Sequence, residues 1–132
     1  MHQAIFTVNE NYVVGPNGQV PVGSTKRRTC CEMRLNGPDI TCCGDGLYSV
    51  TYSATVTPAT TGVIGLQVMK DGEVVPGSTR TGMGTAGEPL PISSIAMVRH
   101  DGCRAFNLSV FLVSPEGATT GATVSLSTVV EK

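Results

Sequence analysis

Between Leu47 and Thr57 the chain alternates without a break between apolar and hydroxyl-bearing side chains. Because successive side chains of a β-strand point to opposite faces, this pattern predicts one long strand with a buried face and a polar face. The polar face is left to solvent or to a partner. The residues expected on the buried face are Tyr48, Val50, Tyr52, Ala54 and Val56.

Alternation of the same kind predicts further strands over Ile92–Val98, Phe106–Val113 and Ala122–Val130. Asp71-Gly72, between two apolar runs, is typical of a hairpin turn. We expect Thr81–Pro89, which holds three glycines and has no periodicity, to be a long flexible loop. Shorter strand candidates are 4–8, 12–14, 20–22, 29–35, 39–43, 63–69 and 74–75. Short strands and frequent turns predict an all-β sandwich, jelly roll or barrel of about eight to ten antiparallel strands.

The charge balance limits the partners of the chain. Nine lysines and arginines nearly cancel ten aspartates and glutamates, and only 14% of the residues are charged. A strongly basic surface normally marks binding to nucleic acid or anionic membranes, so neither partner is predicted. With 132 residues the chain is expected to form one domain around one core. Its first residues lack a basic leader and an apolar run, which predicts synthesis in a cytoplasm without a signal peptide.

Residues able to support catalysis are few. The two histidines are His2, near the start, and His100, which stands beside a predicted turn and next to Asp101. His100 is either a base poised by Asp101 or, as we favour, an exposed turn histidine. The glycine-rich stretch Gly82–Gly87 lacks the lysine and the helix of a phosphate-binding loop. The sequence therefore predicts a protein that is not an enzyme and that binds no cofactor.

The five cysteines are Cys30, Cys31, Cys42, Cys43 and Cys103. Their odd number and the missing signal peptide argue against a disulfide framework. A metal site that includes His100 is one alternative, although adjacent cysteines in a strand point to opposite faces and chelate poorly. A second alternative is a pair of neighbouring strands that brings one cysteine of each pair toward disulfide distance. We favour buried or half-buried thiols without a metal.

The segment Gly46–Ala54, which reads G-L-Y-S-V-T-Y-S-A, is followed by an apolar strand at Val63–Val68 and by K-D-G-E at Lys70–Glu73. In this order the segments resemble the C1q/TNF-like jelly-roll family, and in particular its small bacterial and phage members. The likeness covers Gln19–Lys132 and includes the stretches Q-V-P-V-G, N-G-P-D-I and V-V-P-G-S. Residues 1–18 are then expected to form an N-terminal arm or first strand.

The resemblance implies an all-β jelly-roll sandwich that forms a homotrimer through the flat faces of its sheets. It also implies a structural protein of a bacteriophage, such as a capsid decoration or head-fibre protein, displayed on the virion and made in the host cytoplasm. The alternative is a head domain that binds a carbohydrate or a host receptor. Sugar binding uses aromatic platforms, and the chain has three tyrosines, three phenylalanines and no tryptophan.

Two candidate contact regions follow. The strand 106–113 is apolar on both faces near its end, so we expect Phe111 and Val113 in the trimer contact. A basic cluster is formed by Lys26, Arg27, Arg28 and Arg34. We expect this cluster to bind an acidic capsid surface. The other interpretation is a solvated strand edge whose charges deter aggregation. No metal site and no catalytic residue is predicted.

Overall fold

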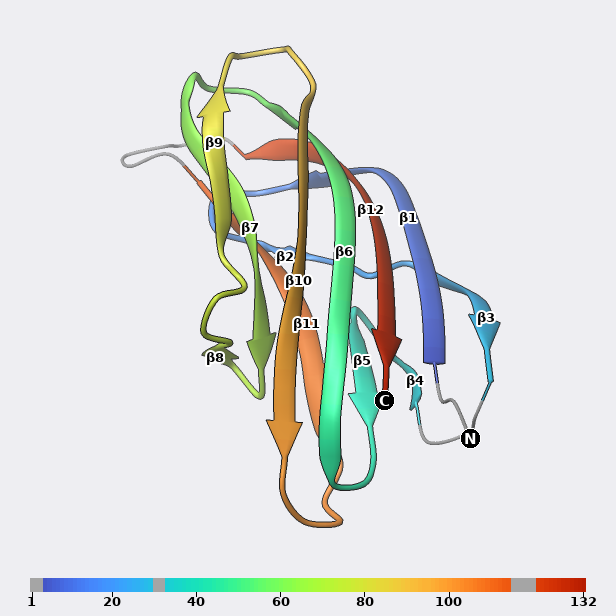
Figure 1. Cartoon of the computed structure of the whole chain (residues 1–132). Coiled ribbons are helices and arrows are strands. Elements are labelled where there is room, and N and C mark those ends of the chain that lie inside the picture. The colour runs from blue at the N-terminus through green and yellow to red at the C-terminus, as the bar shows by residue number, and fades with distance from the viewer. Residues whose placement is uncertain (1–3, 30–32, 115–120) are drawn as a thin grey trace.

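The computed structural model describes residues 4–29, 33–114 and 121–132, and the strands assigned there form two antiparallel sheets packed face to face (Figure 1). The predicted all-β sandwich is confirmed, and the described residues hold twelve strands, two of them only two residues long. Their bounds are β1 Ala4–Val14, β2 Gln19–Val20, β3 Ser24–Arg28, β4 Met33–Asn36, β5 Asp39–Cys42, β6 Gly46–Pro58, β7 Gly62–Lys70, β8 Glu73–Val74, β9 Arg80–Gly84, β10 Leu90–His100, β11 Phe106–Val113 and β12 Ala122–Glu131.

The five-stranded sheet has the order β10-β6-β12-β1-β3, which runs from left to right across Figure 1. Strand β12 lies between β6 and β1, so the last strand of the chain joins the first strand to the rest of the sheet. Residues 4–14, expected as an arm or first strand, form β1 inside this sheet. The register of β1 against β12 shifts between Asn9 and Tyr12, and Asn11 has a positive φ of 50° there.

The seven-stranded sheet has the order β4-β5-β11-β7-β8, and β2 pairs with β11 while β9 pairs with β7. Asp71 and Gly72 join β7 to β8 with φ angles of 50° and 85°. Two successive positive φ angles are what a type I′ hairpin turn requires, so the predicted turn is confirmed.

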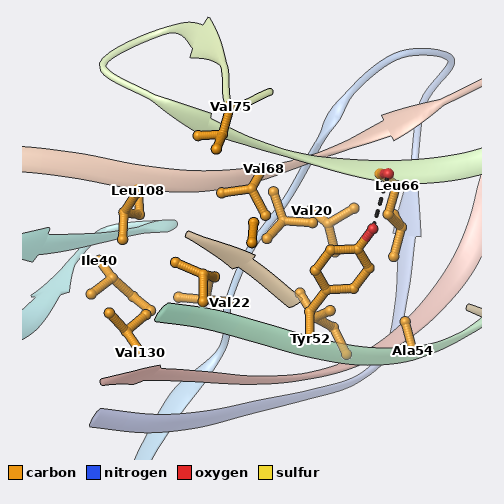
Figure 2. Packing of buried hydrophobic residues seen from close by; sticks show 14 of the residues in the cluster. Val20, Val22, Ile40, Tyr52, Ala54, Leu66, Val68, Val75, Leu108 and Val130 are labelled. Carbon is orange, nitrogen blue, oxygen red and sulfur yellow. Dashed lines mark hydrogen bonds between the residues drawn. The ribbon is translucent and has the colours of Figure 1, made fainter. Parts of the chain in front are cut away.

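The core lies between the two sheets (Figure 2). The inward face of β6 is buried as the alternation predicts, and the rings of Tyr48 and Tyr52 are wholly enclosed. The Tyr52 hydroxyl donates to the carbonyl oxygens of Ser78, at 2.9 Å, and Leu66, at 3.1 Å. The inward face of β11 is also buried; it carries Phe106, Leu108, Val110 and Leu112. Tyrosine hydroxyls that find carbonyl partners let these large rings fill the core.

Two local predictions were wrong. The glycine-rich stretch after Ser78 is not simply a flexible loop, because Arg80–Gly84 is strand β9. A Cβ built on Gly84 would lie 2.9 Å from a side-chain carbon of Ile64, so glycine here permits close packing. Of the expected strand 29–35, Thr29 lies outside any strand and 33–35 belong to β4, whereas residues 30–32 lie outside the described residues.

Candidate interaction surfaces

The outward face of β10, β6 and β12 carries short polar and apolar side chains, and we call it the serine–threonine face. Side chains of the three strands align in rows because the ladders run without a register shift. One such row joins Ile95, Thr51 and Val129. The face comprises Leu47, Ser49, Thr51, Ser53, Thr55, Thr57, Pro91, Ser93, Ile95, Met97, Thr123, Ser125, Ser127 and Val129.

Charge is confined to the ends of this face. The charged side chains on the outward side of its three strands are Arg99, at the end of β10, and Glu131, at the end of β12. Three of its large apolar side chains are exposed, with 60% of Ile95, 52% of Met97 and 51% of Leu47 accessible. The centres of protein interfaces are depleted of charged residues, since burying an unpaired charge is costly. The serine–threonine face therefore suits contact with another protein surface.

A small polar hollow interrupts the serine–threonine face beside the bulge of β1. Its volume is about 200 Å³. Four of its nine lining residues bear hydroxyl groups, namely Ser53, Thr55, Ser125 and Ser127, and Glu10 also lines it. The backbone amide of Asn11 donates to Ser125 Oγ at 3.1 Å, so the bulge itself fixes one wall.

The outer edge of β10 presents free backbone groups. Pro91 has no amide hydrogen, so Pro91 and Thr55 form a non-hydrogen-bonded pair, in which the backbone groups of Pro91 point away from β6. The backbone groups of every second residue after Pro91 point the same way. The Lys70 ammonium donates to the Arg99 carbonyl at 2.9 Å, which agrees with this assignment. In the described part of the chain β10 forms a ladder with β6 alone, so the amides of Ser93, Ile95 and Met97 point to the side of β10 that has no paired strand.

Two hollows follow this edge, between β10 and the strands of the other sheet. One, of about 170 Å³, is lined by Val74, Pro76 and Met97 among others. The second, of about 260 Å³, is lined by Arg80, Leu90 and Ser93 among others. The gap between the sheets is thus open along β10, and apolar and cationic side chains border it.

Tyr52 lies behind this open edge. Burial raises the pKa of its hydroxyl above the ordinary tyrosine value, while the positive charge of Arg80 and a hydrogen bond with Ser94 oppose the rise. Its two carbonyl partners both belong to the other sheet or to the loop before β9. The neutral phenol therefore ties the two sheets together behind the open edge.

Phe111 and Val113, the residues predicted for the trimer contact, lie on β11 in the seven-stranded sheet. Their side chains point outward and are half-buried. In the ladder with β7 they stand opposite Gln67 and Gly65. They belong to the outer face opposite to the serine–threonine face, so the sandwich offers two separate surfaces for self-association.

The basic cluster lies at the other edge of the sandwich. Lys26, Arg27 and Arg28 are exposed on β3, the outermost strand of the five-stranded sheet, and Arg34 is exposed on β4. Strands β3 and β4 contact each other across the gap between the sheets. The Arg28 guanidinium donates to the Met33 carbonyl at 3.5 Å. The structure thus brings the four predicted cations to one edge, on strands and not on an end loop.

His100 contacts Phe106 and the backbone of Arg104. Its ring packs on Phe106 with 4.3 Å between centroids, and Nε2 lies 2.7 Å from the Arg104 carbonyl oxygen. Asp101 accepts a hydrogen bond from Arg99 Nε at 3.3 Å and does not orient the imidazole. His100 is half-buried, which differs from the exposed turn histidine that the sequence favoured.

Two further kinds of feature are relevant to the described ranges, a cluster of metal ligands and a membrane-spanning helix. Among these residues no three histidine, cysteine, aspartate or glutamate side chains could hold a metal ion, and no helix is long and apolar enough to cross a membrane. Cys42 is buried, Cys43 is half-buried and Cys103 is exposed. Cys30 and Cys31, the other half of the predicted cysteine pairs, lie outside the described residues.

Comparison with known proteins identifies the fold. The structure matches the globular domain of zebrafish complement 1qA (10% identity, 98% of this chain and 94% of the other, TM-score 0.69). It also matches murine APRIL (12% identity, 97% and 98%, TM-score 0.66) and the PRD1 vertex protein P5 (16% identity, 98% and 96%, TM-score 0.55). The fold is a C1q/TNF-like jelly roll. No family model and no curated protein matches the sequence.

Within the C1q/TNF-like jelly roll, sequence reasoning found the basic edge but missed the open edge at β10. Alternation in Ile92–Val98 predicted a strand, yet it gave no indication that this strand would be the outermost one. The signal that was available is Pro91, since proline within a strand is largely restricted to edges. The exposure of Ile95 and Met97 on the same strand is seen only in the structure.

Proposed function

We propose that this chain is a non-catalytic structural protein of a phage particle, and that it assembles as a homotrimer that decorates the capsid or forms the head of a fibre. The likeness to the vertex protein of PRD1, a phage member of the same fold, supports the virion setting. The observation that carries the proposal is the pairing of an uncharged sheet face with an unprotected edge strand. Both surfaces are suited to bind further copies of the same chain.

A closed ring of three copies needs a heterologous contact, in which each copy offers two different surfaces. The serine–threonine face is one such surface and the edge of β10 is the other. Ile95 and Met97 belong to both, so the two surfaces are continuous. A stable interface covers about 800 Å² on each partner, which is the area of a few adjacent strands. We therefore assign the trimer contact to these two surfaces.

The sequence-based choice of Phe111 and Val113 stays as the competing proposal for the trimer contact. Phe111 is half-buried within its own sheet, so it has less surface to lose on association than Ile95, of which 60% is accessible. This difference favours the serine–threonine face.

Attachment to the particle is assigned to the basic edge. Strand β3 lies at the opposite end of the five-stranded sheet from β10, so its cations stay accessible when the edge of β10 is covered. A trimer repeats Lys26, Arg27, Arg28 and Arg34 three times. An acidic shell protein would attract this cluster in a salt-dependent way.

A glycan-binding head receives less support. Such a site uses exposed aromatic rings, and Tyr48, Tyr52 and Phe106 are buried in the core. Tyr12, with 46% of its surface accessible, is the exposed aromatic residue among those described, and the hydroxyl-lined hollow holds no aromatic ring.

The experiment compares Thr51→Arg with Phe111→Asp by sedimentation equilibrium of the purified chain. We expect the first variant to be monomeric and the second to remain trimeric, because Thr51 lies at the centre of the serine–threonine face. The reverse result would move the contact to β11, and a monomeric parent chain would overturn the trimer altogether. Immunogold labelling of phage particles with an antibody to the chain tests the virion setting, which is excluded if labelling stays at background.

A further inference from the structure

The chain contains two Asn-Gly sequences, and both form turns at the surface. Asn17-Gly18 lies between β1 and β2, and Asn36-Gly37 lies in the hairpin that joins β4 to β5. An asparagine followed by glycine is open to attack on its own side-chain amide by the backbone nitrogen of the next residue, since glycine has no Cβ to obstruct the approach. In a folded protein the attack is slowed when hydrogen bonds hold the backbone nitrogen of the glycine or the side-chain amide of the asparagine.

Asn17-Gly18 is held on every side. The Gly18 amide donates to the Gly15 carbonyl at 3.0 Å, so the attacking nitrogen is engaged. The side-chain oxygen Oδ1 of Asn17 accepts a hydrogen bond from the backbone N–H of Ser114 at 3.0 Å, and the backbone N–H of Asn17 donates to Ser114 Oγ at 2.7 Å. Attack at this site requires that these bonds open first.

Asn36-Gly37 is free. Asn36, Gly37 and Pro38 are exposed, and within the described residues neither the Asn36 side chain nor the Gly37 amide makes a hydrogen bond. Gly37 has a φ of 60°, and a Cβ built on it would meet no atom within 4 Å. The Asn36 backbone pairs with Asp39, but among the described residues no hydrogen bond holds its side-chain amide away from the Gly37 nitrogen.

We propose that Asn36 is a site of spontaneous deamidation, whereas Asn17 is protected by the fold. The Gly37 nitrogen loses its proton and bonds to Asn36 Cγ, the C–NH₂ bond breaks, and ammonia leaves with that proton. The resulting succinimide is opened by water, whose oxygen ends in an aspartate or isoaspartate carboxylate. The net change is one water consumed and one ammonia released, with no oxidant or reductant.

The new charge falls at a sensitive position. Residue 36 stands directly opposite Asp39 in the β4–β5 ladder and on the same side of β4 as Arg34. A carboxylate there repels Asp39 and offsets a cation of the basic edge. Under the proposed function, ageing of the protein would weaken attachment to an acidic surface. The modification itself does not depend on that function.

The test incubates the intact folded chain in mildly alkaline buffer made with water enriched in the heavy oxygen isotope. Peptide mapping and mass spectrometry then follow the uptake of label at both asparagines. We expect Asn36 to gain a labelled oxygen at least about tenfold faster than Asn17. The same chain unfolded in denaturant serves as the reference, where the two sites should react within about twofold of each other. Asn36→Gln is the matched variant and should remove the new acidic species from ion-exchange profiles. Equal rates in the folded chain, or an unreacted Asn36 when the unfolded chain has converted, would overturn the proposal.

Discussion

The two edges of the five-stranded sheet are built in opposite ways. Strand β3 is five residues long, its register against β1 shifts between Phe6 and Thr7, and three of its residues are cations. Strand β10 is eleven residues long, pairs with β6 in one unbroken register and exposes Ile95 and Met97. Short length, bulges, positive charge and proline are devices that keep edge strands from joining other chains. The comparison teaches that β3 is protected along its whole length, whereas β10 carries such devices only near its ends, at Pro91 and Arg99, and leaves its middle without them.

The largest effect is expected from placing a charge on the unprotected edge. In the proposed trimer, Ile95→Lys would bury an unpaired ammonium in each contact, at a cost of about 3–5 kcal/mol per site. We expect sedimentation to show a monomer with an unchanged circular dichroism spectrum. Thr25→Lys, on exposed β3, is the matched control and should leave the trimer intact. Dissociation by both substitutions, or by neither, would remove the distinction between the edges.

The next effect concerns the charges of β3. If they only deter aggregation, the triple variant Lys26→Thr, Arg27→Thr, Arg28→Thr should form large species in light scattering, because a second unprotected edge then exists. If they also attach the protein to the particle, Arg27→Glu with Arg28→Glu should stay soluble and lower the affinity for particles at least about tenfold at low salt. Unchanged solubility and unchanged occupancy together would leave the basic edge without a role.

A smaller effect is expected from Tyr52, the phenol behind the β10 edge. Its pKa in the folded chain is raised by burial, so the unfolded chain loses the phenolic proton at the ordinary value of about 10 while the folded chain keeps it. The free energy of unfolding is therefore fully retained below pH about 10 and falls as the pH rises through the folded pKa. Denaturant titrations of the parent chain and Tyr52→Phe check this. The prediction is contradicted if the free energy of unfolding falls with pH equally in the parent chain and in Tyr52→Phe.

The smallest effect lies on the β3 side of the core. Thr7 and Thr128 face each other across β1 and β12, are fully buried, and their hydroxyls have no partner within the described part of the chain. By contrast, the hydroxyl of Tyr52, on the β10 side of the core, is hydrogen-bonded. Replacing each threonine by valine keeps its shape and should raise the free energy of unfolding by about 1 kcal/mol. Thr25→Val, on the surface, should change it by less than about 0.5 kcal/mol. A loss of stability in Thr7→Val would show that the hydroxyl is satisfied.

The sequence predicted those strands and turns whose conformation and burial both depend on a short local pattern of residues. Alternation in β6 predicted the strand and its inward face because side-chain direction in a strand depends only on the parity of the position. The Asp71-Gly72 turn was predictable because only a few residues adopt two positive φ angles. The basic edge was found because it depends on four residues that are close in sequence.

What stayed hidden depends on packing between distant segments. Strand β9 was predicted as a loop because its glycines suggest flexibility, yet a Cβ built on Gly84 would lie only 2.9 Å from a side-chain carbon of Ile64, so the glycine there serves close packing. The exposed state of Ile95 could not be predicted either, because alternation is the same in a central strand and in an outer one. Only the topology shows that nothing pairs with the far side of β10 in the described residues.

The pairing of β1 with β12 also bears on how fast the chain can reach its native state. Ala4 lies opposite Glu131, so the ladder that holds the first strand joins residues from opposite ends of the sequence. Pairings of such large sequence separation close late, because the loop entropy is lost before the contact is gained. Until β12 is in place, the side of β6 that it later covers has no partner. Refolding is therefore expected to be slow, and dilution should raise its yield by keeping incomplete sheets apart.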